Sequence, residues 1–277
     1  FTIARNTNEY FDDVRPSEML TKKIREMGVD VFTFIERKWC YTRPKTEKIQ
    51  DKVNENVALL EILSFHDWWK KIGKKTRNMI RKAEKSGIET ENVIPNEKIV
   101  EGIWRIYNET PIRQNRSFPH YGISLQRIQE NIFAQQNAIY IGAYFDDELV
   151  GFIQLIYDSN FSMISQILSL KKYWNKAVNN ALIAKAVHID AAKGIKWLMY
   201  GRMGNHPSLD RFKRNNGFVK FPVSRYFIAL TKRGKLGIKL GMHREMKDIL
   251  PESIKYSLIP IYNWLSRTKL KIGLARK

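Results

Sequence analysis

GAYFDDELVGFIQLIY, residues 142–157, is the stretch that decides the fold. It contains two runs rich in β-branched and aromatic residues, separated by the turn Phe145-Asp146-Asp147. Such a pattern predicts an antiparallel hairpin. The first of these strands is expected to span 138–144, and a third strand-like run, 161–170, follows another polar turn. The sequence therefore predicts an antiparallel meander.

The segments on either side of the meander predict a regular order of strands and helices. Further strands are expected at 88–94, 195–200 and 218–230, and helices at 96–109, 124–136, 176–193 and 207–215. Because a helix joins strands 161–170 and 195–200, these two strands should be parallel neighbours. The predicted fold class is α/β (α+β): a mixed, mostly antiparallel sheet flanked by helices, with one parallel pair that splays.

Four motifs resemble the GNAT superfamily of N-acyltransferases. The hairpin sequence resembles its second and third strands, and SQILSL (165–170) its fourth. NNALIAKAVHIDAAKGIKWLMYG (179–201) resembles the third helix and fifth strand, and LDRFKRNNGF (209–218) the short helix that ends in Gly-Phe. TRNMIRKAEKSGI (76–88) and Phe212-Lys213 are similar to the FemAB-like branch, whose members move amino acids from aminoacyl-tRNA onto peptidoglycan precursors.

The resemblance implies an enzyme that transfers an acyl or aminoacyl group to an amine. The donor would be a thioester, such as acyl-CoA, or aminoacyl-tRNA, and a cell-envelope precursor is one option for the acceptor. Residues 88–230 would form the GNAT-like domain. Residues 1–87, with strands at 29–41 and 56–64 and a basic helix at 66–86, would be a partial second GNAT-like half or a separate module.

The formal net charge of +20 indicates anionic partners. The 277 residues include 48 Lys+Arg and 28 Asp+Glu, which suits an anionic substrate, tRNA or lipid headgroups, or simply a lysine-rich surface. Residues 231–277 form a basic amphipathic extension, expected to cover the domain or, alternatively, to contact a membrane surface. The rival function is a non-catalytic nucleic-acid-binding protein on a degenerate GNAT scaffold.

Cysteine content and hydropathy indicate the compartment. Cys40 is the single cysteine, so neither a disulfide framework nor a cysteine zinc cluster is expected, and no metal is predicted. No apolar run approaches the ~20 residues that span a bilayer, and no signal-peptide pattern opens the chain. We therefore expect a cytoplasmic protein, with contact at the inner face of the membrane as an option.

The expected donor site departs from the GNAT pattern. Many acetyl-CoA-using members carry a Gln/Arg-x-x-Gly-x-Gly/Ala loop at the start of the third helix, whereas residues 171–180, KKYWNKAVNN, contain no glycine. Close backbone approach to a pyrophosphate is then less favourable, and both donors stay open. By position, the donor-binding residues would be Gln166, Ile167, Leu168, Lys171, Lys172, Lys176, Asn179 and Asn180.

Three residues are candidate catalytic groups. Lys213 lies four residues before Gly217, where many GNAT enzymes place a tyrosine acid. If it faces the cleft, Lys213→Ala should lower turnover more than tenfold and leave the melting temperature nearly unchanged; the alternative is a solvated lysine. His120 is a candidate base or a hydrogen-bonded loop residue, and Ser169 a candidate oxyanion donor or merely the end of a strand.

Six residues are candidates for contacting the acceptor. The polar loop 110–123 is long for a compact domain, which favours a functional role. Basic residues also recur at helical spacing in 68–87, where the alternative is a solvated face. The expected acceptor-binding residues are Arg113, Arg116 and Tyr121 in the loop, Arg77 and Arg81 in the helix, and Arg202.

Overall fold

The structure is a computed structural model that describes residues 1–6, 9–11, 16–37, 49–113, 116–158, 160–204 and 206–244. The chain divides into two compact units. Within the described residues, the first unit contains those up to Ala58, 201–204 and those from 220 onward, and the second contains 59–200 and 206–219. The predicted domain boundaries remain predictions. Cys40 and residues 245–277 lie outside the described residues.

The predicted meander is the centre of the second unit. Each strand pairs antiparallel with the next, and a fourth strand pairs antiparallel at its outer side; the strands are β7 (Ala138–Phe145), β8 (Glu148–Asp158), β9 (Phe161–Ser169) and β4 (Glu89–Val93). Asp146 and Asp147 both adopt left-handed φ angles, 50° and 62°. Tight hairpins need this geometry, and aspartate tolerates it better than most residues. The meander is therefore confirmed.

The parallel strand pair is confirmed as well. β10 (Trp197–Met199) lies beside β9, with Trp197 opposite Phe161 and Met199 opposite Met163. Beyond Met163, β9 continues to Ser169, where no pairing with β10 is found among the described residues. In its pairing with β8, β9 also carries one extra residue, Ser165, so the strand bulges. The pairing of the two parallel strands is therefore limited to the first part of β9.

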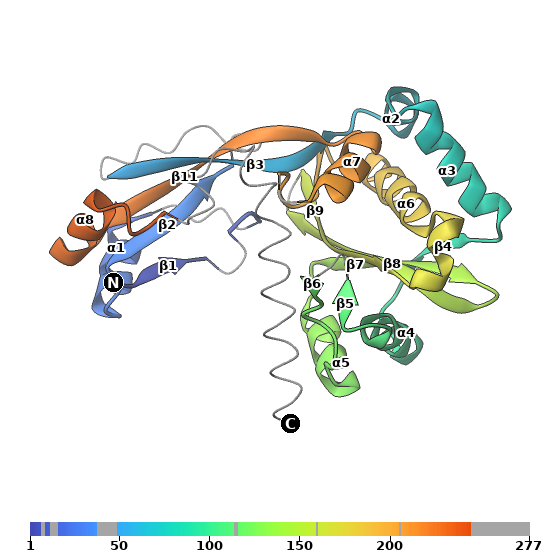
Figure 1. The fold of residues 1–277 in the computed structure, drawn as a ribbon, viewed down its shortest axis with the longest axis horizontal. Helices are drawn as coiled ribbons and strands as arrows, with labels where there is room; N and C mark the ends of the chain where they lie inside the picture. The colour runs from blue at the N-terminus through green and yellow to red at the C-terminus, as the bar shows by residue number, and fades with distance from the viewer. Residues whose placement is uncertain are drawn as a thin grey trace. The chain divides into compact units, whose positions relative to one another are not determined.

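Helices cover both faces of this sheet (Figure 1). On one face lie α4 (Glu97–Asn108) and α5 (Leu125–Ala134), each started by a side chain that caps the first turn. On the other face lies α6 (Val178–Ala192), with α3 (Lys74–Lys85) packed against it. α4 approaches the sheet closely at Gly102, where a Cβ atom would lie only 2.5 Å from Leu149. This contact requires glycine.

The single basic helix predicted at 66–86 is wrong. The structure has two helices, α2 (Phe65–Lys71) and α3, separated by Ile72 and Gly73. Ile72 has extended geometry with ψ 144°, which ends α2. The guanidinium of Arg77 donates to the carbonyl oxygens of Ile72, at 2.6 Å, and Trp69, at 3.1 Å. This side chain satisfies carbonyl groups that the break leaves without helical partners.

Two further segments differ from their predicted boundaries. The helix expected from 176 begins at Val178, after a 3₁₀ segment, η1 (Lys171–Lys176), and Ala177 with a left-handed φ of 57°. The polar loop 110–123 contains a small antiparallel sheet of β5 (Ile112–Arg113) and β6 (Arg116–Ser117). The short helix α7 (Pro207–Asn215) spans the predicted residues.

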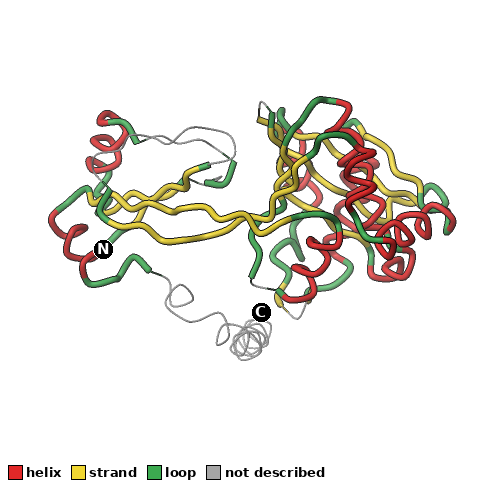
Figure 2. The backbone as a smooth tube through the Cα atoms, turned by 90° about the horizontal axis from the view of Figure 1, so that it is seen from above, coloured by secondary structure: helices red, strands yellow, loops and turns green. Residues whose placement is uncertain are grey.

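Within its described residues, the first unit adds four strands and two helices. The strands are β1 (Ile3–Arg5), β2 (Val31–Glu36), β3 (Asp51–Glu61) and β11 (Val219–Ala229), and the helices are α1 (Glu18–Glu26) and α8 (Lys232–Lys239). The strand predicted at 56–64 thus starts earlier and ends at Glu61. Side chains of α1 and α8 pack against alternate residues of β2 and β11, so the two helices lie on opposite faces of these strands (Figure 2).

The hydrogen-bonded strand order is β1-β2-β11-β3-β10-β9-β8-β7-β4, and the last residues of β3 belong to the second unit. β1 and β2 are parallel, as are β9 and β10. The pairs β2–β11, β3–β10, β8–β9, β7–β8 and β4–β7 are antiparallel. The predicted fold class, a mixed and mostly antiparallel sheet flanked by helices, is therefore confirmed. None of the described helices has the length and apolarity to cross a bilayer.

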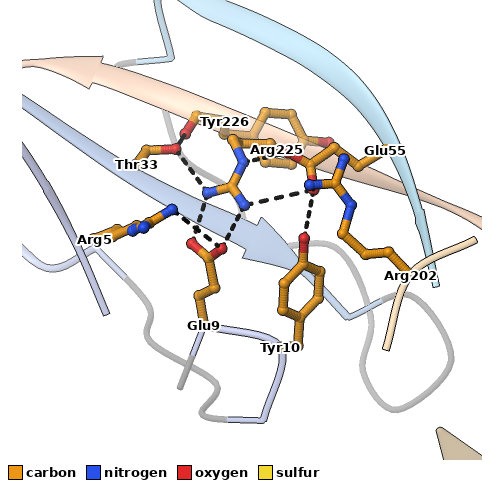
Figure 3. Close-up of polar contacts among 8 residues, drawn as sticks. All are labelled: Arg5, Glu9, Tyr10, Thr33, Glu55, Arg202, Arg225 and Tyr226. Atoms are coloured by element: carbon orange, nitrogen blue, oxygen red, sulfur yellow. Dashed lines mark hydrogen bonds and ion pairs between the residues drawn. The ribbon is translucent and has the colours of Figure 1, made fainter. Parts of the chain in front are cut away.

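A buried ion network ties together the strands of the first unit (Figure 3). The guanidinium of Arg225 donates twice to the carboxylate of Glu9, both at 2.7 Å, and twice to that of Glu55, at 2.5 and 3.5 Å. Tyr10 donates to Glu55 at 2.8 Å, and Arg202 lies 3.7 Å from the same carboxylate. Burial alone would raise the pKa of Glu55, but the bonds and charges of its partners outweigh burial and lower it.

Candidate active site

A polar cavity of about 300 Å³ lies in the second unit, between the sheet and helices α4 and α5. The polar side chains of its wall come from α4, α5, the intervening loop and strands β7, β8 and β9: Tyr107, His120, Asn131, Gln135, Tyr140, Gln154 and Gln166. The remaining wall is isoleucine and phenylalanine, with no Lys, Arg, Asp or Glu among its described residues. In a chain of net charge +20, this uncharged cavity is distinctive.

Hydrogen bonds fix the polar atoms of the cavity wall. The Tyr107 hydroxyl donates to Oε1 of Gln166. The Gln154 amide donates to the Tyr140 hydroxyl at 2.6 Å and to the Gln135 side chain. Burial raises the pKa of both tyrosines to about 12, so both stay protonated at neutral pH. The wall therefore offers oriented neutral dipoles to a ligand.

His120 enters the cavity from the loop between α4 and α5. Its ring stacks on Tyr107, with centroids 4.6 Å apart, and meets the edge of Phe118 at 5.3 Å. Burial lowers the pKa of His120 below its ordinary value of 6.5. The imidazole is therefore mostly neutral at pH 7, with a ring nitrogen able to accept a proton.

Lys213 is buried, so the prediction of a solvated lysine as its alternative is wrong. The residue is 3% exposed, and its Nζ lies 4.4 Å from the centre of the Tyr200 ring. Burial lowers the pKa of Lys213 to about 8, and the nearby Asp210 carboxylate opposes this. Near pH 7, the group is mainly an ammonium that can lose a proton at little cost.

Residues of three other helices hold the carboxyl end of the helix that carries Lys213. Thr76 donates to the carbonyl oxygen of Asn215 at 3.0 Å, and the Trp68 indole donates to that of Asn216 at 2.9 Å. Asn180 of α6 contacts the Asn216 side chain at 3.4 Å. The carboxyl end of α7 is thus bonded to three other helices, which limits the positions that Lys213 can take.

The three lysines expected to bind the donor all have partners within the protein. Lys172 pairs with Glu148 at 3.0 Å, Lys176 donates to the carbonyl oxygen of Ser86 at 2.9 Å, and Lys171 approaches that of Ile112 at 3.4 Å. Only Lys172 loses its net charge in this way, because the other two contact uncharged carbonyl groups. The region therefore keeps two positive charges.

The other predicted donor residues are spread over both faces of β9. Gln166 lines the cavity, and Leu168 packs into the core beneath α4 and α5. Ser169 is 2% exposed, next to Gly151, and within the described residues its hydroxyl has no hydrogen-bond partner. The same is true of Oδ1 of Asn179 at the start of α6. Ile167 is half-buried.

The structure does not bring the predicted acceptor residues together. Arg113 is buried and donates to the carbonyl oxygens of Ser169, at 3.0 Å, and Ile106, at 2.7 Å. Arg77 caps α2, and Arg202 belongs to the ion network of the first unit. Tyr121 is 47% exposed, Arg81 lies over the Trp69 ring, and the side chain of Arg116 is outside the described residues.

Two of the cavity residues missed by the sequence analysis left detectable signals. Gln154 interrupts the apolar run 149–156 of a buried strand, and a polar residue there needs a partner. Tyr107 lies in the last turn of α4, immediately before the polar loop. Asn131 and Gln135 had no such signal, because they lie on an ordinary amphipathic helix and at its C-cap.

The parallel pair β9–β10 and the cavity that contains His120 lie within one segment of the chain. Residues 100–218 match the Acetyltransferase (GNAT) family. This segment is therefore similar to the acetyltransferases of the GNAT family. A search of curated protein sequences finds no match.

Solved structures share this fold at low sequence identity. FemX is 10% identical, with a TM-score of 0.56 over 80% of this chain and 78% of that one. The C-terminal domain (DUF2156) of a lysylphosphatidylglycerol synthetase from Agrobacterium fabrum is 12% identical, with a TM-score of 0.55 over 81% and 75%. L-PGS from Bacillus licheniformis is 14% identical, with a TM-score of 0.54 over 82% and 77%. These similarities concern the fold.

Proposed function

We propose that the chain is a FemAB-like N-acyltransferase whose acceptor amine enters the cavity beside His120. The observation that carries the proposal is the combination of an uncharged, polar cavity with a histidine whose pKa is lowered by burial. An amine must be unprotonated to attack a carbonyl carbon. A cavity wall without carboxylates gives no ion pair to an ammonium, and therefore favours the neutral amine.

His120 would act as the general base. As the amine nitrogen bonds to the carbonyl carbon, it becomes positively charged and must lose one proton, which the neutral imidazole accepts. Gln166 lies in the same wall, on the part of β9 beyond its pairing with β10. Its amide, held by Tyr107, would orient the acceptor rather than take part in proton transfer.

Lys213 would act as the general acid. Collapse of the tetrahedral intermediate breaks the bond to a thiolate or to a ribose oxygen, and that atom needs one proton. An acid is most effective when its pKa lies near the working pH, and the pKa of Lys213 is about 8. A lysine in this position also stabilises negative charge before the transfer.

The donor is acyl-CoA or aminoacyl-tRNA, and its phosphates would lie near the start of α6. The left-handed Ala177 provides there a turn for which glycine is the usual residue. Support for an amino acid as the transferred group comes from two proteins of similar fold, FemX and a lysylphosphatidylglycerol synthetase, the latter named for the transfer of lysine. An acceptor belonging to the cell envelope, and work at the inner face of the membrane, are parts of the same proposal.

The proposal is tested with the full chain and both donors. Acetyl-CoA and, separately, aminoacyl-tRNA are supplied with a panel of amines that includes peptide amines, and transfer of a labelled acyl group is measured. His120→Gln should lower kcat by ~10²-fold or more, the usual contribution of a general base. As pH is lowered, the activity of the unaltered protein should decrease with an apparent pKa, that of His120, below 6.5. His120→Gln should not show this decrease.

His188→Gln is the matched control, because His188 is an exposed histidine of α6 that does not line this cavity. Equal activity and an unchanged pH profile in His120→Gln would refute the role of His120. No transfer from either donor, together with tight binding of uncharged tRNA, would instead favour the non-catalytic nucleic-acid-binding alternative.

A further inference from the structure

A second cavity, of about 480 Å³, lies on the opposite face of the same sheet. Its walls come from α2, α3, α6 and β4, and the described residues that line it are all different from those that line the cavity beside His120. Figure 1 shows α3 and α6 on one side of strands β7 and β8, and α4 and α5 on the other. A ligand here would not contact the proposed catalytic groups of the first cavity. We call this second cavity the α3–α6 cavity.

The floor of the α3–α6 cavity is aliphatic. Ile80 and Ile88 are 2% and 4% exposed, and Ala181 and Ala184 are buried beside them on α6. Because the side chains of the two alanines are short, they leave the space beside this part of α6 open. Such a surface favours a flexible hydrocarbon chain, which gains contact with each methylene group that it buries.

The aromatic wall is less suited to a planar ring. Trp69 already has Phe65 stacked against it, with centroids 6.0 Å apart, and the Arg81 guanidinium over its ring at 5.4 Å. A nucleobase stacking on Trp69 would have to displace one of these partners. Phe65 is itself held by Trp68 and by the edge of His188. The wall therefore offers ring edges and apolar surface rather than a free stacking face.

The mouth of the cavity carries unneutralised positive charge. Arg81 and Lys185 line it, and among the described residues neither forms an ion pair. Glu84 is the one acidic side chain of the described lining, so the excess is positive. Lys172, in contrast, is paired with Glu148. Two cations above an aliphatic floor complement a molecule with an anionic head and an alkyl chain.

We propose that the α3–α6 cavity binds an anionic amphiphile. Its alkyl chain lies on the floor formed by Ile80, Ile88 and Ala184, and its phosphate or carboxylate contacts Arg81 and Lys185. The volume is within the range of about 300–1,000 Å³ that small-molecule sites occupy. The site is independent of the proposed acyl transfer, and its test uses no catalytic measurement.

The test is calorimetric binding of decyl phosphate, kept below its micelle concentration, to the full chain. Ala184→Leu fills the floor and should weaken binding by about tenfold, a loss of roughly 1.4 kcal/mol. The double variant Arg81→Gln/Lys185→Gln should weaken it by about tenfold or more and also reduce its dependence on salt. This pair keeps the test decisive if Ala184→Leu does not fold.

Lys82→Gln is the matched control, an exposed cation on α3 that does not line the cavity. It should leave binding unchanged, and decyl maltoside, with the same chain and an uncharged head, should bind more weakly than decyl phosphate. Absence of binding by the unaltered protein would overturn the proposal. So would an equal loss in Lys82→Gln and in the double variant, or full affinity in folded Ala184→Leu.

Vesicles of phosphatidylglycerol distinguish two sources of this ligand. If Ala184→Leu weakens vesicle binding as well as decyl phosphate binding, the ligand is a phospholipid drawn from the bilayer. If only decyl phosphate binding falls, the ligand is a free amphiphile. Both results uphold the cavity as the binding site.

Discussion

Replacing Lys213 by methionine should stabilise the protein at neutral pH and abolish most of its activity. Burial lowers the pKa of Lys213 from 10.5 to about 8. At about 1.4 kcal/mol per pKa unit, keeping this ammonium charged in the folded protein costs about 3 kcal/mol at pH 7. Methionine has a similar length and no charge. Because the pKa of about 8 already includes the attraction of Asp210, we expect a net gain of up to ~3 kcal/mol in the free energy of unfolding.

The dependence on pH identifies the cause of this gain. Between pH 8 and 10.5 the unfolded chain binds the proton of Lys213 and the folded chain does not, so the free energy of unfolding of the unaltered protein rises with pH. The penalty applies below pH 8 and disappears above 10.5. The advantage of Lys213→Met should therefore be largest near pH 7 and shrink by about 2 kcal/mol or more at pH 10.

Urea denaturation at pH 7 and pH 10, extrapolated to water, measures these differences. Lys75→Met, an exposed lysine of α3, is the control and should change stability little at either pH. If the two proteins kept a constant difference from pH 7 to pH 10, Lys213 would not be the desolvated group described here. The sequence alone suggested an unchanged melting temperature on its removal, and burial is the reason to expect otherwise.

Three further outcomes are expected. Calorimetry should show that coenzyme A binds weakly and that its affinity falls steeply as salt is raised. The reason is that Lys171 and Lys176 attract its phosphates by charge alone, and no glycine loop brings backbone N–H groups close to the pyrophosphate. Tight binding at high salt would contradict this. Arg225→Met should lower the free energy of unfolding, measured by urea denaturation, by about 3–5 kcal/mol, because it leaves the carboxylates of Glu9 and Glu55 without this partner. Arg5→Met, at the exposed edge of the network, is the control and should cost less than ~1 kcal/mol. Burial raises the pKa of Asp190 to about 6, although hydrogen bonds from Ser162 and Tyr157 oppose this. The free energy of unfolding should therefore fall as pH rises from about 4 to 6, because the folded chain keeps the Asp190 proton over this range and the unfolded chain does not. Asp190→Asn should remove this pH dependence, and an unchanged dependence would refute the role of Asp190.

The sequence was sufficient for the sheet of the second unit. Alternation of apolar residues, and turns with aspartate or glycine at positions of positive φ, are local features, and they placed β7, β8, β9 and the helices around them within a few residues. Where a local signal was ambiguous, the prediction failed. The basic stripe of 66–86 continues in phase across Ile72 and Gly73, and the break depends on carbonyl groups that Arg77 of the next helix satisfies, a side-chain contact that the periodicity does not show.

The candidate site depended on tertiary structure, because burial is a property of packing and cannot be measured along the chain. By sequence, Lys213 is one cation among several in RFKRN, and only the packing of α7 against Tyr200 makes it a group with a pKa of about 8. Arg113 appeared equally functional, yet it is used to bond backbone carbonyls. The sequence by itself determined which chemical groups are available and in which elements they lie. The folded chain decided which of them lose water, because desolvation is imposed by neighbours that are remote in sequence.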